Sequence, residues 1–143
     1  MNISKNFTWE EFCRSETADR HGVVNSINTY ELRDAVKALV NNVLQPLRNA
    51  YGKPMRINSG YRSPELNALV YGSPTSQHVK GEAADIATGS QTESYRLARL
   101  AKTLGLPYDQ MILYPTIVHF SHKLRGEQRG QILYNRLYRG RKV

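Results

Sequence analysis

Apolar residues form one helical stripe between positions 32 and 47 of the chain. They recur at spacings of four, three, four and four, which is the period of a single helix face. Asn28-Thr29-Tyr30-Glu31 supplies a helix start, and Gly52 followed by Pro54 supplies a stop. The pattern therefore predicts a long helix, which Pro46 bends in its last turn. The residues of the stripe are Leu32, Val36, Leu39, Val43 and Leu47.

Shorter helices are predicted where a capping residue precedes an apolar pattern. Thr8-Trp9-Glu10-Glu11 and Ser90-Gln91-Thr92-Glu93 have the form of capping boxes. Ser63 followed by Pro64 opens another helix, which runs to about Val70. Residues 15–27 show little periodicity and are predicted to form a loop. The helix after Ser90 is expected to end at Gly105 and to bury Leu97, Leu100, Ala101 and Leu104.

Strands are predicted in the segments 55–58, 82–86, 110–114 and 117–121. Pro115-Thr116 separates the last two segments and gives the signal of a hairpin. Helices dominate the first part of the chain and strands the later part. This order favours an α+β fold with a small, mainly antiparallel sheet and helices packed on it. The length of 143 residues suits a single domain that spans 1–143.

Charge is the feature of the composition that adds most to this picture. Twenty Lys and Arg against 12 Asp and Glu give a net charge of +8, which favours binding to nucleic acid, anionic lipid or an anionic bacterial cell wall. Near the C-terminus, basic residues alternate with Tyr134 and Tyr138. We interpret the chain from about residue 123 as a basic C-terminal extension, and its last eight positions as a solvated end rather than a nucleic-acid patch. The last basic residues are Arg136, Arg139, Arg141 and Lys142.

The sequence shows no pattern of a leader or a membrane span. Residues 1–8 lack the apolar core of a secretory signal, and no window approaches the roughly 18 apolar residues of a transmembrane helix. Cys13 is the only cysteine, which excludes an intrachain disulfide. We expect a monomer that is made in the cytoplasm, with any export arranged by a separate system such as a phage holin.

The stretch Ser76-Gln77-His78-Val79-Lys80-Gly81-Glu82-Ala83-Ala84-Asp85 holds the main candidates for chemistry. His78 and Asp85 are seven positions apart, which would put them on opposite faces of a strand. Gly81 permits a turn between them, so that both can point at one centre. On the strand 117–121, His119 is the candidate partner, and His122 falls on the opposite face. Two His and one carboxylate form a common ligand set for catalytic zinc, although each residue alone is more often structural.

Two further polar residues lie close to these candidates in sequence. Arg62 follows the first predicted strand of the main sheet, where it could bind a carboxylate or stabilise an oxyanion. Ser76 precedes His78 by two positions and could bind substrate or orient a ligand. Without such a function, Arg62 would be an exposed arginine in a turn and Ser76 a serine in a loop.

Three elements in order resemble the zinc D-alanyl-D-alanine carboxypeptidase family. They are Ser59-Gly60-Tyr61-Arg62-Ser63, Ser76-x-His78-x-x-Gly81-x-Ala83-x-Asp85 and Val118-His119-x-Ser121. The family includes phage L-alanyl-D-glutamate endopeptidases and the vancomycin-resistance D,D-dipeptidases, and the resemblance runs from about Phe7 to His122.

The resemblance implies a fold shared with hedgehog signalling domains, peptidoglycan stem peptides as substrate, and Zn²⁺ as cofactor. It implies that His78, Asp85 and His119 are the zinc ligands. It also implies that Arg62 contacts the substrate or transition state and that Ser76 contacts the substrate.

One position departs from the family pattern. These peptidases usually carry a Glu or Asp general base three residues before the last ligand, where this chain has Thr116. A hydroxyl does not accept a proton near neutral pH, and the loss of a positioned base costs roughly 10²–10⁴-fold in rate. Glu82, Asp109 and His122 are the candidate substitutes, and Glu82 is the one we favour as a catalytic residue.

Two functions follow as hypotheses. The first is zinc-dependent hydrolysis of a peptide bond in peptidoglycan, by a D,D-carboxypeptidase or by an endopeptidase of the endolysin type. The second is a catalytically impaired, zinc-containing module that binds the cell wall, which Thr116 favours. A third hypothesis, a nucleic-acid-binding domain, is supported only by the basic tail and the net charge. We expect no specific binding to nucleic acid.

Overall fold

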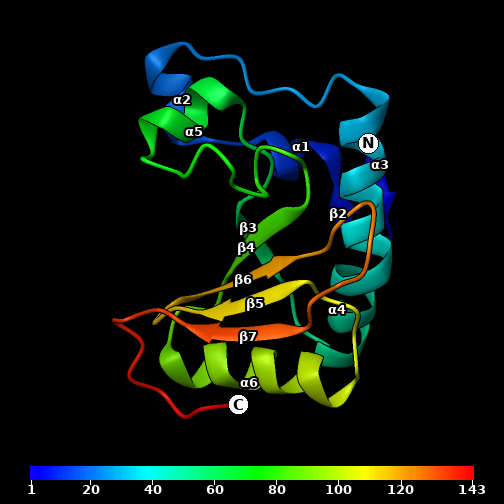
Figure 1. The fold of residues 1–143 in the computed structure, drawn as a ribbon, viewed down its shortest axis with the longest axis vertical. Helices are drawn as coiled ribbons and strands as arrows, with labels where there is room; N and C mark the ends of the chain where they lie inside the picture. Colours follow the sequence, from blue (N-terminus) through cyan, green and yellow to red (C-terminus); the bar gives the residue numbers. More distant parts are fainter.

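The computed structural model describes all 143 residues, which fold into helices packed around a five-stranded sheet (Figure 1). The helices are α1 (Trp9–Cys13), α2 (Glu16–His21), α3 (Tyr30–Leu39), the π-helical η1 (Val40–Leu44), α4 (Gln45–Tyr51), α5 (Pro64–Leu69) and α6 (Gln91–Thr103). The strands are β1 (Asn2–Ser4), β2 (Phe7–Thr8), β3 (Arg56–Ser59), β4 (Ala83–Ala87), β5 (Gln110–Leu113), β6 (Ile117–Ser121) and β7 (Gln131–Tyr134). None of the helices combines the length and the apolar character needed to cross a bilayer.

The main sheet has the strand order β3-β4-β6-β5-β7. Its neighbouring strands are antiparallel except β5 and β7, which run parallel. β1 and β2 form a separate two-stranded sheet. The expected α+β fold with a mainly antiparallel sheet is confirmed.

The register of the sheet aligns residues from its four antiparallel strands. Asp85 on β4 pairs with Ser59 on β3 and with His119 on β6, and His119 pairs with Ile112 on β5. Paired residues project from the same face of a sheet, so Asp85 and His119 emerge side by side. Residues at the alternate positions point into the hydrophobic core: Ala84, Ile86, Met111, Leu113, Val118 and Phe120.

The predicted long helix forms in three consecutive parts, α3, η1 and α4. Pro46 has no N–H to donate, and just before it the amide of Gln45 bonds to the carbonyl of Val40, five residues back. A π-helical segment therefore precedes Pro46 and joins the two α-helical parts. The buried stripe is confirmed for Val36, Leu39, Val43 and Leu47, which are fully buried, while Leu32 is partly buried.

Two local predictions were wrong. Residues 16–21 form helix α2 within the expected loop, because Ser15 caps it by accepting the amide of Ala18 at 3.1 Å. A helix of six residues is too short to show a clear apolar period. Leu104 lies at the C-terminal end of α6 and is 44% exposed, so it does not join the core.

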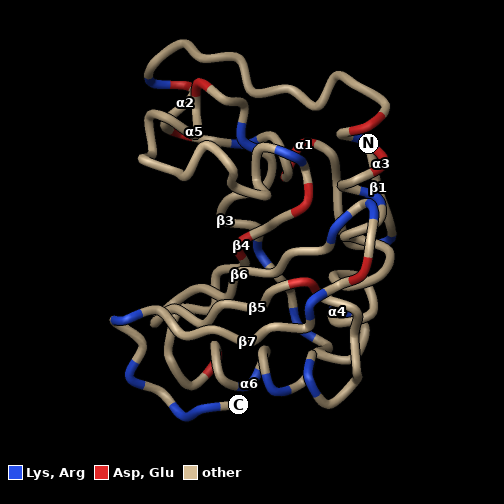
Figure 2. Tube along the Cα trace, in the orientation of Figure 1, with Lys and Arg blue, Asp and Glu red and all other residues tan.

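The basic stretch from about residue 123 contributes to the fold, although most of its last eight residues are exposed. Its strand β7 pairs with β5, and Tyr138 is buried. Lys142 lies 4.1 Å from the ring centroid of Tyr134, so part of the alternation of basic and aromatic residues serves packing within the chain. Figure 2 shows the Lys and Arg residues along this stretch and on α6.

Candidate metal centre

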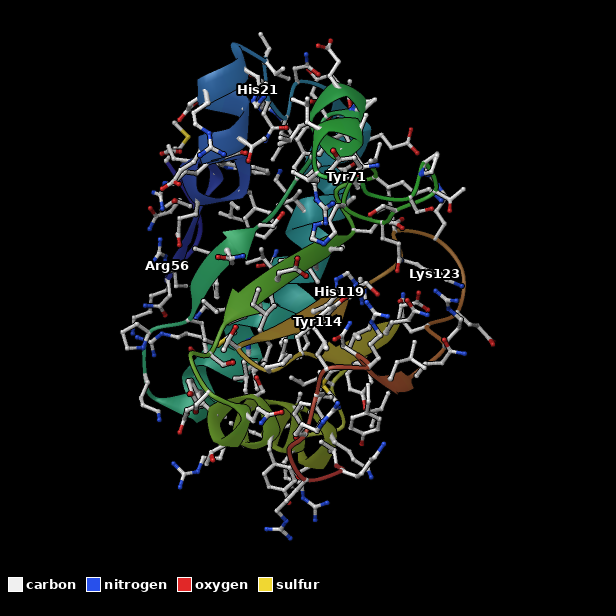
Figure 3. The ribbon with its side chains drawn as sticks, turned by 90° about the vertical axis from the view of Figure 1, so that its left-hand side faces the viewer. His21, Arg56, Tyr71, Tyr114, His119 and Lys123 are labelled. Atoms are coloured by element: carbon white, nitrogen blue, oxygen red, sulfur yellow. The ribbon has the colours of Figure 1, made fainter.

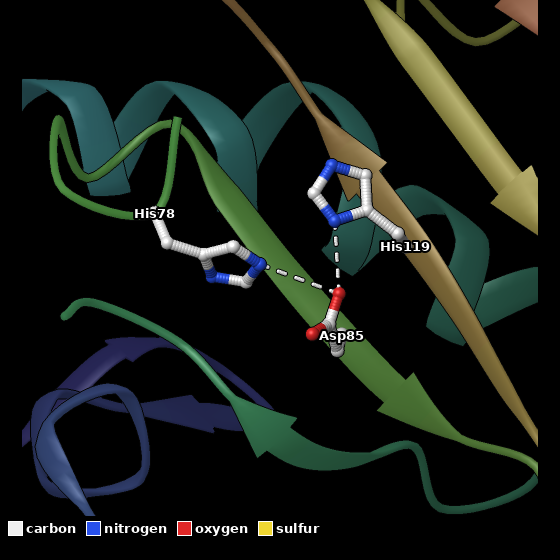
Figure 4. Close-up of side chains that lie close together, drawn as sticks. All are labelled: His78, Asp85 and His119. Atoms are coloured by element: carbon white, nitrogen blue, oxygen red, sulfur yellow. Dashed lines mark hydrogen bonds and ion pairs between the residues drawn. The ribbon is translucent and has the colours of Figure 1, made fainter. Parts of the chain in front are cut away.

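His78, Asp85 and His119 converge on one point of the sheet face (Figure 4). Each offers a ligand atom, and these atoms all lie within 4.8 Å of one another. Asp85 Oδ1 lies 2.9 Å from His119 Nδ1 and 3.4 Å from His78 Nε2. The register of β4 and β6 brings Asp85 and His119 together, whereas His78 arrives from the turn before β4.

Gly81 makes this turn possible, as the sequence predicted. Its φ of 72° lies in the left-handed region that glycine adopts readily. It also lies against α3, where an added Cβ would come within 3.1 Å of the carbonyl oxygen of Leu32. The turn therefore reverses the chain between His78 and Asp85 and lets both side chains reach the same point.

The surroundings of His78 suit a metal ligand. The residue is 2% exposed, and its Nδ1 donates to the carbonyl of Gly60 at 2.7 Å. This bond places the ring proton on Nδ1 and leaves a lone pair on Nε2, toward Asp85. Nε2 is buried and makes no hydrogen bond. A buried imidazole nitrogen of this kind, beside a carboxylate and a second imidazole, fits a zinc ion held by two His and one Asp.

Asp85 is held in its charged form. Burial acts to raise the pKa of this carboxyl, but the neighbouring His78 and His119 outweigh burial and lower the pKa well below its usual range. The carboxylate needs no deprotonation step before it can bind a cation at neutral pH.

Arg62 lies beside the three residues and is held by two contacts. Its amide donates to the carbonyl of His78 at 3.1 Å, and its Nη1 donates to Asn67 Oδ1 at the same distance. Asn67 is buried and donates in turn to the carbonyl of Ser73. Gly72 leaves room for this pair, because a Cβ there would lie 2.0 Å from Asn67 Oδ1. The Nε of Arg62 is buried and makes no hydrogen bond.

Ser76 caps the turn that carries His78. Its Oγ accepts the backbone amide of His78 at 3.2 Å, and the residue lines the same pocket as the histidine. The hydroxyl proton is still free to donate. Ser76 thus has both an orienting contact and access to a bound molecule.

A pocket of about 440 Å³ opens over the three residues. Asp85 is the only carboxylate that lines it. Tyr114 lines it as well, and the sequence analysis missed this residue, although alternation along the strand places Gln110, Ile112 and Tyr114 on one face. Burial, and then the charge of Asp85, raise the pKa of Tyr114, with Arg62 opposing them. The phenol therefore keeps its proton at neutral pH and can act as a donor.

The position expected to carry the general base lies outside this pocket. Thr116 is exposed in the turn between β5 and β6, where its carbonyl accepts the amide of Thr88 at 2.8 Å. The residue of this segment that faces the pocket is Tyr114, two positions earlier. The identity of residue 116 therefore says little about proton transfer at this site.

The three candidate substitutes for the base all have other partners. Glu82 accepts from Gln77 at 3.2 Å and from the amide of Leu124 at 3.0 Å, and it lines a neighbouring cavity. Asp109 is fully buried and bound by Arg129. His122 is 8% exposed, with its Nδ1 donating to the carbonyl of Pro107. The geometry does not support the choice of Glu82 as a catalytic base.

A further cavity adjoins the candidate centre on the side of β3. This cavity, of about 600 Å³, shares Arg62 and Asp85 with the pocket and extends along β3. In Figure 3, Arg56 on β3 and Lys123 lie on opposite sides of His119 and Tyr114. An elongated molecule could therefore lie across the centre.

Comparison with known proteins agrees with the motif resemblance. The family described as Peptidase M15 matches residues 5–121. A protein named zinc D-Ala-D-Ala carboxypeptidase, from Streptomyces albus G, is 38% identical over 88 residues, which cover 60% of this chain. The match covers 32% of that relative, so the chain corresponds to about a third of its length.

Proposed function

We propose that this chain, which belongs to the M15 peptidase family, hydrolyses a peptide bond in peptidoglycan stem peptides with the help of a zinc ion. One observation carries the proposal: His78, Asp85 and His119 meet within 4.8 Å at the floor of an open pocket, and His78 Nε2 is buried there without a hydrogen bond. The similarity to a zinc D-Ala-D-Ala carboxypeptidase supports the choice of metal and of substrate class.

His78, Asp85 and His119 would hold the ion, with Gly60 fixing the orientation of His78. Zinc, when bound, supplies Lewis acidity that polarises a carbonyl and lowers the pKa of water. Three protein ligands are the usual number for a catalytic site, which keeps one position for the reaction.

Arg62 and Tyr114 provide hydrogen-bond donors where negative charge would develop on the carbonyl oxygen of the substrate. Arg62 has a buried, unpartnered Nε, and Tyr114 keeps its phenolic proton. Donors fixed before the reaction stabilise a developing oxyanion without reorganising. Ser76 lines the same pocket and would bind the peptide backbone.

The cavity along β3 adjoins the pocket over the centre, and this extended space favours an internal cut over removal of a terminal residue. The pocket over the centre and the cavity along β3 would each hold one side of the scissile bond. We therefore favour an endopeptidase of the endolysin type over a D,D-carboxypeptidase. As its site of action we propose the bacterial cell wall, reached after holin-type release from the cytoplasm.

A zinc-containing module that binds the cell wall without turnover is the second candidate. It is favoured by the pocket lining, which contains no carboxylate other than Asp85 and no imidazole other than His78 and His119. The pocket therefore offers no separate general base for proton transfer. The loss of a general base typically lowers the rate roughly 10²–10⁴-fold.

Zinc titration and peptide hydrolysis together test the proposal. The protein should bind one zinc ion per chain and release new amino termini from synthetic stem peptides, and His78→Ala should lose both properties. Zinc binding at full stoichiometry by His78→Ala would refute the ligand assignment. Zinc binding by the wild type without any hydrolysis would support the binding module.

A further inference from the structure

A second arginine, Arg129, lines the pocket over the candidate metal centre. It belongs to the segment between β6 and β7, far in sequence from Arg62. It also lines a neighbouring cavity of about 290 Å³, which shares Thr75 and Gln77 with the pocket. Arg129 therefore lies where the two cavities meet.

Asp109 fixes the side chain of Arg129. The carboxylate is fully buried, and it accepts from Arg129 Nη2 at 2.7 Å and from Nε at 3.1 and 3.2 Å. It also accepts the backbone amide of Arg129 at 2.8 Å. A guanidinium held in this two-point geometry has little freedom to turn away. The side-chain hydrogen bonds of Arg129 use only Nε and Nη2, which leaves Nη1 free, and the side chain is 44% exposed.

Positively charged side chains outnumber carboxylates in the cavity of about 290 Å³ beside Arg129. Lys80, Lys123 and Arg125 also line it, and Glu82 is its only carboxylate. Glu82 already accepts from Gln77 and from a backbone amide, and Arg125 pairs with Glu31 at 2.7 Å. Lys123 lies 3.8 Å from Asp109, which thus faces two cations.

We propose that Arg129 is a specificity-determining residue that binds a carboxylate of the substrate, with Asp109 as its positioning residue. This inference rests on the proposed function for the substrate class, and it narrows that class to peptides with a carboxylate on the Arg129 side of the scissile bond. Such a carboxylate is either an acidic side group or a free C-terminus. The Nη1 and Nη2 end of the Arg129 guanidinium still has N–H groups to donate. These donors suit an acidic side group or a C-terminus equally, because the planar guanidinium matches the geometry of a carboxylate.

The test measures binding of a synthetic stem pentapeptide, containing D-Glu and ending in D-Ala-D-Ala, to the metal-free protein by calorimetry. Three forms of the peptide are compared: unmodified, amidated at the free carboxyl of D-Glu, and amidated at the C-terminus. One of the amidations should weaken binding to the wild type about 10–100-fold, the loss expected for a hydrogen bond between charged groups. The form that loses affinity identifies the source of the carboxylate.

Arg129→Gln should bind all three forms with similar, weak affinity. Arg99→Gln, which removes an exposed cation from α6, is the matched control and should keep the preference of the wild type. Because Arg129→Gln leaves Asp109 buried without its main cation, the double variant Asp109→Asn/Arg129→Gln serves if the single variant does not fold.

The proposal is overturned if the wild type binds none of the peptides or binds the three forms equally. It is also overturned if Arg129→Gln weakens all three forms by the same factor, or if it keeps the preference for the carboxylate. Because binding is measured without metal, loss of hydrolysis in the zinc-loaded protein would count against the peptidase proposal alone.

Discussion

Replacing Gly81 with alanine tests whether the turn between His78 and Asp85 depends on a residue without a side chain. The left-handed backbone costs a non-glycine residue about 1–2 kcal/mol. At Gly81 the new Cβ would also lie 3.1 Å from the carbonyl oxygen of Leu32 and 3.3 Å from Val36 Cγ2. Such overpacking adds about 1–3 kcal/mol, since helix α3 must move or the turn must shift.

Gly105→Ala is the matched control. Gly105 has a φ of 65°, close to the 72° of Gly81, but a Cβ added there would have no other atom within 4 Å. Both variants carry the backbone cost, and only Gly81→Ala carries the crowding. If the crowding is worth about 2 kcal/mol, Gly81→Ala should melt about 4–8 °C below Gly105→Ala.

Metal affinity gives the second readout of this pair. A shift of the turn displaces His78, so Gly81→Ala should bind zinc roughly tenfold or more weakly, as is typical when the support of a ligand is disturbed. Gly105→Ala should bind zinc like the wild type. Thermal denaturation of the metal-free proteins and competition with a chelator measure the two effects. Equal melting temperatures and equal zinc affinities of the two variants would refute the reasoning.

Three further outcomes are expected. Asn67→Ala removes the hydrogen bond that orients the arginine of the site and should lower kcat/KM roughly tenfold without changing zinc content, as steady-state kinetics and metal analysis can show. Tyr114→Phe should lower kcat about 10-fold or more with little change in KM, whereas Thr116→Ala, altered at an exposed turn, should match the wild type in the same assay. A hydrogen bond from Tyr51 lowers the pKa of Glu93 from its ordinary 4.5 to about 2, so its stabilising effect is present above pH 4.5 and is lost as the pH falls toward 2. Glu93→Gln should thus melt below the wild type at pH 7 and together with it near pH 2, and an equal gap at both pH values would contradict this.

The convergence of the three candidate ligands could be predicted from sequence because short-range rules determine most of its geometry. A glycine between His78 and Asp85 permits the turn, and alternation along a strand gives His119 its face. The pairing of Asp85 with His119 depends on strand order, which no local pattern contains. The motif resemblance supplied that information.

Sequence distance was a poor guide to distance in space for three other features. Glu82 lies between two ligands in the sequence, yet its carboxylate turns toward the amide of Leu124. Thr116 lies three residues before His119, yet it belongs to the turn, and Tyr114 faces the pocket. Strand β7 was not predicted because it is short and lies at the edge of the sheet with basic neighbours, and only its pairing with β5 reveals its place in the sheet.

Digestion of purified peptidoglycan by the zinc-loaded protein, analysed by mass spectrometry, tests the central claim most directly. The proposed function predicts new amino termini within the stem peptides, formed only when zinc is present and absent with His78→Ala. The position of the new termini would also identify the bond. Intact peptidoglycan after treatment with protein that holds one zinc ion per chain would contradict the claim.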